Sequence, residues 1–526
     1  MSAEEFETDV LIIGGGMAAT WAGITAARAG ARVTLVDKGF VGASGVTATG
    51  GPNHWWVPPD EEQRRAAIDK RWATSHGLAE KAWMARIIDM TWRLLPQLAP
   101  YYAFDKNGAG ETYYSGVRGP EYMRALRRFS EAEGVRILDH HPALELLRRS
   151  DGSIAGAAGY ARLDRRDWIA RAGAVILATG GAGFRSGLLG SHNNTGDGHL
   201  MAVEAGAELS GMEFCVAYSI SPAWNSTRTL PYLAARFFDA AGTELDIAPP
   251  MSGPAHLQTL AAALARGPVF AELHDAPALL KDVLRQIQPA SLPPFERKGL
   301  DLFKDRFPVT LYGEGTIRGT GGLRVVDDAC QTSVPGLFAA GDAATRELIA
   351  GATSGGGALN AAWALTSGVL AGEGAAATAK ARARRADGPV SALGQAGLRP
   401  HGAARPIDAR GIIALAGEQI LSPTKALWRN RPALEDSAAK LEQAWDEVSR
   451  HGHAEGLDKV GVREAAAVAA TARWSNAAAL AREESRGMHM RSDIPGPAAD
   501  LARRLLVGGL ESTWTRYEAV AAAEAA

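Results

Sequence analysis

Short, wholly apolar runs that end in glycines or other small residues recur along the chain. The first two, DVLIIGGG (residues 9–16) and ARVTLVDK (31–38), flank a run with helical spacing of its apolar residues, MAATWAGITAARAG (17–30). Similar runs enter small-residue turns at 172–183 and 336–345. Such runs are typical of buried parallel strands, and two of them joined by a helix indicate a β–α–β unit. The pattern predicts an α/β fold with a ligand across the carboxyl ends of the strands.

The pattern changes twice further along the chain. Between about residues 215 and 334, prolines and irregular short runs replace the regular alternation, and we interpret this stretch as a domain inserted over the first. From residue 405 onward, apolar residues recur every three or four positions, as in ALEDSAAKLEQAWDEVSRH, which predicts amphipathic helices. The chain of 526 residues is also too long for one simple core, so several domains are expected.

Composition and charge exclude several classes of function. Hydrophobic residues make up 46% of the chain and charged residues 22%, and the formal net charge of -2 gives no sign of a nucleic-acid-binding surface. Only Cys215 and Cys330 are present, which excludes an iron–sulfur cluster or a cysteine-based zinc site within the chain, and we expect no metal. The acidic N-terminus shows no secretory signal, and no apolar run approaches the ~18 residues of a membrane span. A soluble, cytoplasmic protein is therefore expected.

A dinucleotide fingerprint follows the first apolar run. Gly14, Gly16 and Ala19 occupy the GxGxxG/A positions between a predicted strand and a predicted helix. Gly14 permits the tight turn, Gly16 lets the backbone approach a pyrophosphate, and the start of the helix offers free N–H groups. Asp37 ends the next strand about 20 residues further on, where an acidic side chain accepts hydrogen bonds from a ribose. The fingerprint suits either FAD or NAD.

The small-residue loop that comes next, VGASGVTATGG, favours FAD, because a nicotinamide dehydrogenase would usually continue its regular β–α–β repeat here. At this point the sequence resembles the FAD-dependent fumarate reductase/succinate dehydrogenase flavoprotein family, which includes L-aspartate oxidase. The resemblance covers most of the chain and rests on GGGMAATWAGITAARAGARVTLVDK, ATGGAG, NTGDGHLMAVEAGAELSGMEF, GLFAAGDA and AREESRGMHMRSDIP, in the family's order. TGDGxxMAxxAGA together with ESRGxHxRxD is more specific than the fingerprint alone.

The resemblance implies a Rossmann-like FAD-binding domain with an inserted α+β capping domain and a C-terminal helical domain. In this sequence the FAD-binding domain would be discontinuous, at residues 1–214 and 335–385, the capping or substrate domain would span 215–334, and the helical domain 400–526. The loop GATSGGGALN would lie against the pyrimidine edge of the flavin, where backbone N–H groups stabilise negative charge on the reduced ring. The expected cofactor-binding residues are Gly14, Gly16, Met17, Ala18, Asp37, Lys38, Ser44, Gly50, Gly51, Ala178, Thr179, Gly180, Asp197, Gly341, Asp342, Gly357, Ala358 and Leu359.

The sequence departs from the family at its functional loops. The loop at residues 43–51 contains no histidine, to which some relatives attach FAD covalently, so we expect non-covalent FAD. Ser354 falls at or next to the position of an arginine that dicarboxylate-handling relatives carry. The RGEGG arginine has no match in RTLPYLAARFFDAAG, and the HYTMGG and QFHP histidines are also absent. Because arginine is the natural bidentate clamp for a carboxylate, we expect a substrate other than a simple dicarboxylate.

Candidates for the catalytic groups are Arg318, Tyr218, Arg486 and His489. Arg318, in TIRGTGG, is expected beside the active-site glycines as an anion contact or proton relay, with a surface ion pair as the alternative. Tyr218 is either a proton-transfer group or a packed aromatic side chain. Arg486 and His489, in ESRGMH, are expected either near the flavin or in a structural network that joins the helical domain to the FAD-binding domain.

These features predict an FAD-dependent oxidoreductase that transfers a hydride between a small organic substrate and the flavin. No second GxGxxG indicates a separate NAD(P)H domain, so electrons are expected to pass to oxygen, a quinone-like acceptor or a protein partner. Two alternatives remain open. One is a flavoprotein subunit that passes electrons to an iron–sulfur partner, as in adenylylsulfate reductase. The other is a non-catalytic flavin-binding protein.

Overall fold

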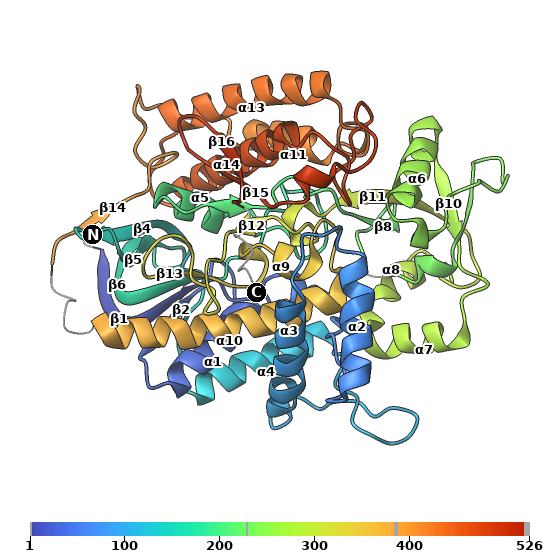
Figure 1. Cartoon of the computed structure of the whole chain (residues 1–526), viewed down its shortest axis with the longest axis horizontal. Helices are drawn as coiled ribbons and strands as arrows, with labels where there is room; N and C mark the ends of the chain where they lie inside the picture. Colours follow the sequence, from blue (N-terminus) through green and yellow to red (C-terminus); the bar gives the residue numbers. More distant parts are fainter. Residues whose placement is uncertain (1–2, 228–229, 383–387, 520–526) are drawn as a thin grey trace.

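The central element of the protein is a mixed β-sheet, seen on the left of Figure 1, in a computed structural model that describes residues 3–227, 230–382 and 388–519. Five parallel strands are extended on one side by three antiparallel strands. In spatial order the strands are β14 (Val390–Ala392), β4 (Ala143–Arg149), β5 (Ile154–Ala161), β6 (Arg166–Leu177), β1 (Glu4–Ile13), β2 (Val33–Val36) and β3 (Arg136–Leu138), with β13 (Leu337–Ala339) also pairing with β6.

Three parallel strands of this sheet end at the same edge. β1, β6 and β13 end at Ile13, Leu177 and Ala339, and the register places Ile13 beside Leu177 and Leu177 beside Ala339. All three side chains are buried, as expected for parallel strands that are covered on both faces. The small-residue turns that follow these strands in the sequence therefore meet at one edge, and the predicted α/β fold is confirmed.

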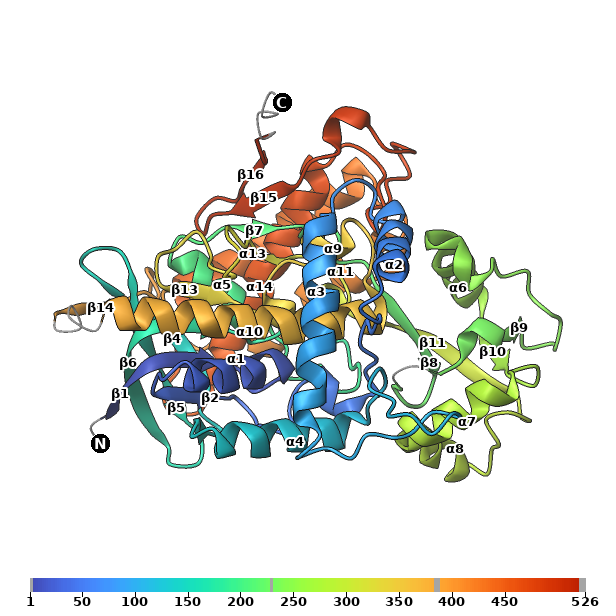
Figure 2. The ribbon, with the colours of Figure 1, turned by 60° about the horizontal axis from the view of Figure 1, so that its bottom comes forward.

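Two helices lie unusually close together over the sheet. α1 (Met17–Arg28) and α10 (Gly356–Arg382) run side by side in Figures 1 and 2. A Cβ added at Gly368 of α10 would lie only 2.4 Å from the carbonyl oxygen of Ala18, and one at Gly372 would lie 2.5 Å from that of Ala22. Larger residues would push the helices apart, so these glycines let the two backbones touch. The contact fixes the first turns of both helices relative to the edge of the sheet.

Further helices surround this pair. Their bounds are α2 (Glu61–Ala73), α3 (Lys81–Leu94), α4 (Gly119–Ala132), α5 (Asp197–Glu204) and α9 (Glu347–Ala350). The amphipathic α3 and α4 bury their apolar faces in the main hydrophobic core, whereas α2 buries none of its residues fully. Asp60 begins α2, and its side chain accepts a hydrogen bond from the N–H of Gln63 at 2.8 Å. The last turn of α2 contacts the chain just before α10.

A second, antiparallel sheet lies to the right in Figure 1 and has a core of its own. Phe295 and Phe307 meet edge to face in this core, with ring centroids 4.9 Å apart. Its strands, in spatial order, are β8 (Tyr218–Pro222), β11 (Phe307–Gly313), β10 (Val269–Glu272) and β9 (Arg236–Phe238), and its helices are α6 (Pro254–Arg266), α7 (Ala278–Ile287) and α8 (Pro293–Glu296). These elements fall within the range predicted for the capping domain, although the domain bounds themselves stay a prediction.

The segment from residue 409 to 481 is mainly helical and packs on the other side of the central sheet from α1 and α10 (Figure 1). Arg463 of α14 and Glu204 of α5 form a buried ion pair that joins this layer to the sheet domain. The helices are α11 (Ala409–Leu421), α12 (Pro423–Ala426), α13 (Arg431–His451) and α14 (Asp458–Ala481), and a small sheet follows the order β12 (Gly322–Leu323), β7 (Leu209–Ser210), β15 (Leu505–Gly508) and β16 (Trp514–Tyr517). In the part of the chain that the structure describes, no helix has both the length and the apolar character needed to cross a membrane.

Candidate functional site

A cavity of about 480 Å³ opens at the edge of the sheet where β1, β6 and β13 end. The turns after these three strands form its floor, the first turns of α1 and α10 form one wall, and the loop between β2 and α2 forms another. Its lining includes Gly14, Gly16, Met17, Ala18, Asp37, Lys38, Ser44, Gly50, Gly51, Ala178, Thr179, Gly180, Asp197, Gly341, Asp342, Gly357 and Ala358. The structure thus brings these predicted cofactor-binding residues together around one space.

Glycine is required at Gly14 and at Gly16 of the fingerprint for two different structural reasons. Gly14 has φ +116°, and a Cβ there would lie 2.2 Å from the carbonyl oxygen of Ala178, so no other residue fits the turn. A Cβ at Gly16 would meet nothing within 4 Å, because that side of the residue faces the cavity. Gly16 is also the N-cap of α1, whose first N–H groups therefore face the same space. This is the geometry that binds a pyrophosphate.

Asp37 stands at the end of β2 with one carboxylate oxygen committed to the protein. Its Oδ1 accepts hydrogen bonds from Gly39 N and Ser44 Oγ, each at 2.8 Å. Burial raises the pKa of Asp37, and these two hydrogen bonds oppose the rise. Within the described residues, Oδ2 has no hydrogen-bond partner, and it is the oxygen that suits a ribose hydroxyl.

Lys38 lines the cavity, but its ammonium group is already occupied. Nζ donates to Thr195 Oγ1 at 2.7 Å, Asp197 Oδ2 at 2.6 Å and Glu464 Oε1 at 2.9 Å. An ammonium group has three N–H donors, so the protein uses all of them. The side chains of Lys38 and Asp197 thus neutralise each other beside the cavity, and the contact of Lys38 with Glu464 connects α14 to it.

Two asparagines at the cavity wall carry buried oxygens that lack a partner. Asn194 Oδ1 and Asn360 Oδ1 are buried and accept no hydrogen bond from a described residue, and both residues line the cavity. A buried acceptor without a donor is costly, and a ligand with N–H or O–H groups removes that cost. FAD has such groups on its ribose, ribityl chain and flavin ring. Together with the glycine-lined floor, the unsatisfied acceptors show that the residues present fit FAD.

Leu359 is the exception among the predicted cofactor-binding residues. Its side chain is 3% exposed and belongs to the main hydrophobic core, and it is absent from the cavity lining. Ala358 and Asn360 on either side of it both line the cavity. Successive residues of a helix point about 100° apart, so the position of Leu359 on α10 turns it toward the core. Asn194 stands just before the TGDG turn, and Asn360 closely follows the GATSGGG turn. Their position beside glycine-rich turns is the sequence signal that could have identified them as cavity residues.

Arg318 is the one proposed catalytic residue that lines the cavity. Its Nε lies 3.5 Å from the Oε2 atom of the buried Glu314, which sets the direction of the side chain. The fully buried Arg346 supports this turn, since its Nη2 donates to Thr316 O at 2.6 Å and Ile317 O at 3.1 Å and its Nη1 pairs with Asp342. Arg318 thus offers a positive charge to the cavity from a rigid turn.

Tyr218 does not line the cavity. Its hydroxyl donates a hydrogen bond to Leu421 O at 2.9 Å, and its ring packs beside Val216 and Ala426. Burial raises the pKa of Tyr218 above its ordinary value, which opposes loss of the phenolic proton. The geometry matches the packed-aromatic alternative, so the proton-transfer role expected for Tyr218 has no structural support.

Arg486 lies away from the cavity lining, in a buried network. Its Nε donates to Glu484 Oε1 at 2.7 Å, its Nη1 to His76 O at 2.6 Å and its Nη2 to Ala498 O at 2.7 Å. Four hydrogen bonds from the guanidinium to one carboxylate and two carbonyl oxygens hold three chain segments together. This is a structural role, and it replaces the catalytic one that the sequence analysis considered.

His489 belongs to the same buried layer. Its Nδ1 lies 2.6 Å from Arg429 Nη1, and its Nε2 lies 3.0 Å from Arg482 O. Burial lowers the pKa of His489 well below its ordinary value, and the neighbouring Arg429 lowers it further. The imidazole is therefore neutral and accepts from Arg429 while it donates to the carbonyl oxygen. Like Arg486, it does not line the cavity.

The side chains before α2 pack beside the cavity. His54 is 1% exposed, its Nε2 lies 3.3 Å from Tyr122 Oη, and burial lowers its pKa to about 4. Trp55 N donates to Ala358 O at 3.2 Å, which ties this segment to the first turn of α10. Trp56 packs against Trp92, with ring centroids 4.2 Å apart. These contacts show that His54 is a neutral histidine packed in the core.

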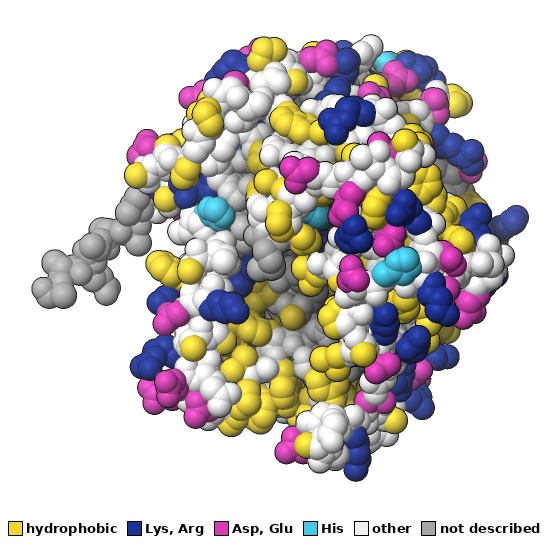
Figure 3. Space-filling model, turned by 90° about the vertical axis from the view of Figure 1, so that its right-hand side faces the viewer, with side chains coloured by type: hydrophobic (Ala, Val, Ile, Leu, Met, Phe, Trp, Pro, Cys, Tyr) yellow, Lys and Arg dark blue, Asp and Glu magenta, His cyan; other side chains and the backbone are white. Residues whose placement is uncertain are grey.

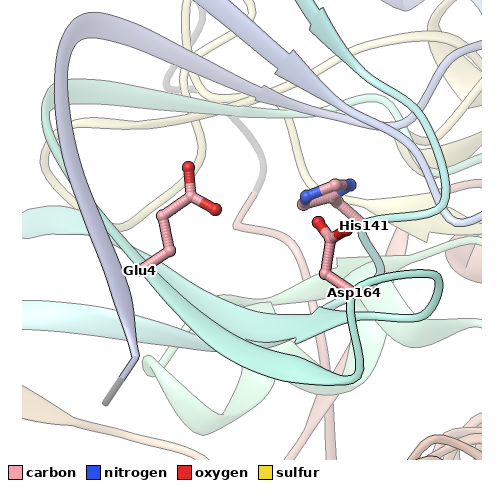
Figure 4. A group of neighbouring side chains, drawn as sticks. All are labelled: Glu4, His141 and Asp164. Atoms are coloured by element: carbon pink, nitrogen blue, oxygen red, sulfur yellow. The ribbon is translucent and has the colours of Figure 1, made fainter. Parts of the chain in front are cut away.

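Figure 3 shows that the face formed by the right-hand side of Figure 1 is hollowed, with hydrophobic side chains gathered along its lower part. This hollow lies beside the capping sheet. Figure 4 shows a separate group, Glu4, His141 and Asp164, whose polar atoms lie within 4.8 Å of one another. Arg166 pairs with Glu4 at 2.6 Å and with Asp164 at 3.8 Å, so this group is an ion-pair cluster. The cluster lies close behind the cavity wall, since His141 N donates to Asp37 O at 2.7 Å and the next residue, Pro142, lines the cavity.

Comparisons with known proteins agree with the cavity. A family model described as "FAD binding domain" matches residues 9–103 and 106–230, and one described as "Fumarate reductase flavoprotein C-term" matches 419–515. The chain is 27% identical to L-aspartate oxidase of Mycobacterium leprae, with 95% of each chain covered. It is 32% identical to one subunit of the fumarate reductase (CoM/CoB) of Methanothermobacter marburgensis, over 40% of this chain and 42% of that protein.

Solved structures share the fold. Quinol fumarate reductase of E. coli superposes with a TM-score of 0.79 at 20% identity, covering 98% of this chain and 97% of that one. Adenylylsulfate reductase of Archaeoglobus fulgidus does so with a TM-score of 0.75 at 18% identity, covering 98% and 96%. The cofactor is thus FAD, and the protein is an FAD-dependent oxidoreductase that belongs to the fumarate reductase/succinate dehydrogenase flavoprotein family.

Proposed function

We propose that this protein holds FAD non-covalently in the cavity and transfers a hydride between the flavin and a small organic substrate other than a simple dicarboxylate. When bound, FAD supplies the group that accepts or donates the hydride. The residues of the chain would do the rest. The start of α1 and Gly16 would bind the pyrophosphate, and Asp37 would bind the adenosine ribose. The N–H groups at the start of α10 would face the flavin ring.

Non-covalent binding is supported by the side chains around the flavin loop. Val46, Thr47 and Ser44 line the cavity, and residues 43–51 contain no histidine to form a bond with the flavin. His54, the nearest histidine in the sequence, is fully buried against Tyr122. The protein should therefore release its flavin when it is unfolded.

The observation that carries the substrate proposal is the small number of cations at the cavity. Among the described residues that line it, Lys38 and Arg318 are the cationic ones, and Lys38 is neutralised by Asp197 and Glu464. Arg318 lies 3.5 Å from the buried Glu314, and even an unpaired guanidinium could not clamp both carboxylates at the ends of one substrate. Ser354, at or next to the position where the resemblance places an arginine, cannot supply the missing charge.

The test uses the purified protein with its flavin. Acid precipitation should release all of the yellow colour into the supernatant, whereas colour that stays with the pellet would contradict non-covalent binding. Succinate and L-aspartate should fail to bleach the oxidised flavin without oxygen, and fumarate should fail to reoxidise the photoreduced flavin. Rapid reaction with any of these three compounds would overturn the substrate proposal while it left the FAD assignment intact.

We also propose that a protein partner is one candidate for the electron acceptor. The relative from Methanothermobacter marburgensis is named as one subunit of its enzyme, which motivates the proposal. The photoreduced protein would be mixed with aerated buffer while the visible flavin band is followed. Recovery over many minutes would support a dedicated partner, and recovery within seconds would point instead to oxygen as the acceptor.

A further inference from the structure

Arg71, in the last turn of α2, brings a guanidinium without an acidic partner to the glycine-rich loop before α10. Its Nη2 lies 3.2 Å from both Thr353 Oγ1 and Ser354 O. Its Nε is buried without a hydrogen-bond partner, and within the described part of the chain no carboxylate reaches ion-pair distance. Burial lowers the pKa of Arg71, with no neighbouring charge to oppose the change.

The backbone holds Arg71 firmly in this place. Ala352 N donates to Ser75 O at 3.1 Å, and Thr353 Oγ1 lies 3.3 Å from Thr74 O. Gly351 has φ +60°, and a Cβ there would lie 2.0 Å from Ser75 O. The end of α2 and the loop therefore touch backbone to backbone, which holds the base of the Arg71 side chain beside the loop.

The loop leads directly from Arg71 to the cofactor cavity. Gly357 lines the cavity and comes only three residues after Ser354, which contacts Arg71. A Cβ added at Gly356 or Gly357 would meet nothing within 4 Å, so open space adjoins this part of the loop. The first N–H groups of α10 add positive potential at the same place.

A purely structural role explains only part of this arrangement. Binding the loop uses Nη2, whereas a guanidinium has five N–H donors in a fork that matches a carboxylate. Arg486, which is structural, differs in that Glu484 and two carbonyl oxygens occupy its donors. A partly buried arginine whose charge has no partner, beside an open cavity, is the expected state of an anion site without its anion.

We infer that Arg71 binds a carboxylate group of the substrate at the edge of the flavin cavity. It would do so from α2, in place of the arginine that the resemblance places on the loop itself at Ser354. The inference deepens the proposed function and rests on it. It narrows the substrate class to organic monocarboxylates, because Lys38 and Arg318 are already paired with acids, which leaves Arg71, without an acidic partner in the described part of the chain, for one carboxylate. The remainder of the molecule would be directed toward the flavin.

Benzoate is a suitable probe, because a carboxylate near the flavin perturbs the visible flavin band and benzamide is its neutral counterpart. The FAD-loaded protein would be titrated with each compound. Arg71→Gln should weaken benzoate binding by roughly 10- to 100-fold, the range of a lost hydrogen bond to a charged group, and leave benzamide binding unchanged. Arg71→Lys, which keeps the charge, should recover most of the loss. Arg65→Gln, an exposed arginine on the same helix, is the matched control and should have no effect.

Equal benzoate affinity in the wild type and Arg71→Gln would overturn the inference. So would a wild type that binds benzamide as tightly as benzoate, or one that does not respond to benzoate at all. If Arg71→Gln fails to fold, Arg71→Lys and the salt dependence of the wild type decide, because binding through a charge must weaken as salt rises. Absence of flavin from the purified wild type is a separate result, and it would contradict the proposed function itself.

Discussion

The cofactor side and the substrate side of the cavity are built from different materials. The cofactor side consists of backbone and small residues at the ends of strands and the starts of helices, such as Gly14, Gly16 and Ala178. The substrate side depends on long side chains from distant segments, such as Arg71 on α2 and Arg318 after β11. Backbone geometry is set by short sequence motifs, whereas a long side chain takes its direction from whatever packs against it. Short sequence motifs therefore predict the cofactor side of the cavity, and they do not predict the substrate side.

The largest effects on folding and flavin content are expected from a side chain placed at either of two neighbouring glycines. Gly14→Ala should prevent folding or yield protein without flavin, because its Cβ would lie 2.2 Å from a backbone oxygen and φ is +116°. Gly16→Val should fold, because its side chain enters the open cavity, but should lose FAD by blocking the space for the pyrophosphate. The ratio of flavin to protein absorbance, together with circular dichroism, separates the two effects.

Gly461 of α14 provides the control, since a Cβ there meets nothing within 4 Å and lies outside the cavity lining. Gly461→Ala should keep its flavin and gain a few tenths of a kcal/mol up to about 1 kcal/mol in stability. A Gly16→Val protein with a full flavin content would contradict the placement of the pyrophosphate beside α1.

Glu347 and Glu213 are fully buried and lie outside the cavity lining. Burial raises the pKa of Glu347 to about 7, and the neighbouring Glu213 contributes to the rise. A carboxyl group with a raised pKa holds its proton better in the folded state, so folding stability falls as pH rises from about 4.5 to about 7. Glu347→Gln should remove this dependence and stabilise the protein above pH 7 by up to about 3 kcal/mol.

Urea unfolding of the wild type and of Glu347→Gln at several pH values between 4 and 8 tests this expectation. The two stability curves should lie close together near pH 4.5 and separate as pH rises. Curves that stay parallel over the whole range would show that Glu347 is already ionised in the folded protein.

The charge at the cavity can be tested without knowing the substrate. Sulfite adds to oxidised flavins and leaves a negative charge on the ring, which a nearby cation stabilises. Arg318→Gln should therefore weaken sulfite binding about tenfold, since a partly exposed charge contributes on the order of 1 kcal/mol. Removing the opposing charge by Glu314→Gln should strengthen it. Sulfite affinity that is the same in Arg318→Gln and in the wild type would show that the guanidinium lies too far from the flavin ring.

The same contrast explains which residues could be predicted from the sequence. Residues within or next to glycine motifs, such as Asp37 and Gly357, line the cavity, because the motif itself determines the local backbone. Leu359 lies in the core because a helix turns each successive residue by about 100°, and the motif does not say which face is buried. Arg486 and His489 sit in a recognisable motif, but their partners come from segments far away in the sequence. No local pattern contains that information.

Arg71 is a residue that the sequence motifs could not have identified as part of the site. It occurs in an ordinary polar helix, EEQRRAAIDKRWA, with no motif to distinguish it from Arg64 or Arg65. Only the packing of α2 against the loop at Thr353 and Ser354 gives it a special environment. When a binding group stands on a neighbouring helix instead of on the loop, motif comparison does not find it. The comparison registers only that the expected residue is missing from the loop.

The smallest effect is expected at Tyr218. It tests whether this residue belongs to the substrate side of the cavity or only to the surrounding protein core. Its hydroxyl is bound to Leu421 O and its residue does not line the cavity. Tyr218→Phe should therefore cost about 1 kcal/mol of stability, the net contribution of one buried hydrogen bond, and leave the flavin spectrum, sulfite affinity and rate of flavin reoxidation as in the wild type. Val309→Ala in β11, a buried apolar position of the capping core, is the matched control for lost stability. A change in the pH dependence of flavin reoxidation in Tyr218→Phe, with none in Val309→Ala, would mean that the phenol takes part in proton transfer and that the substrate side extends as far as β8.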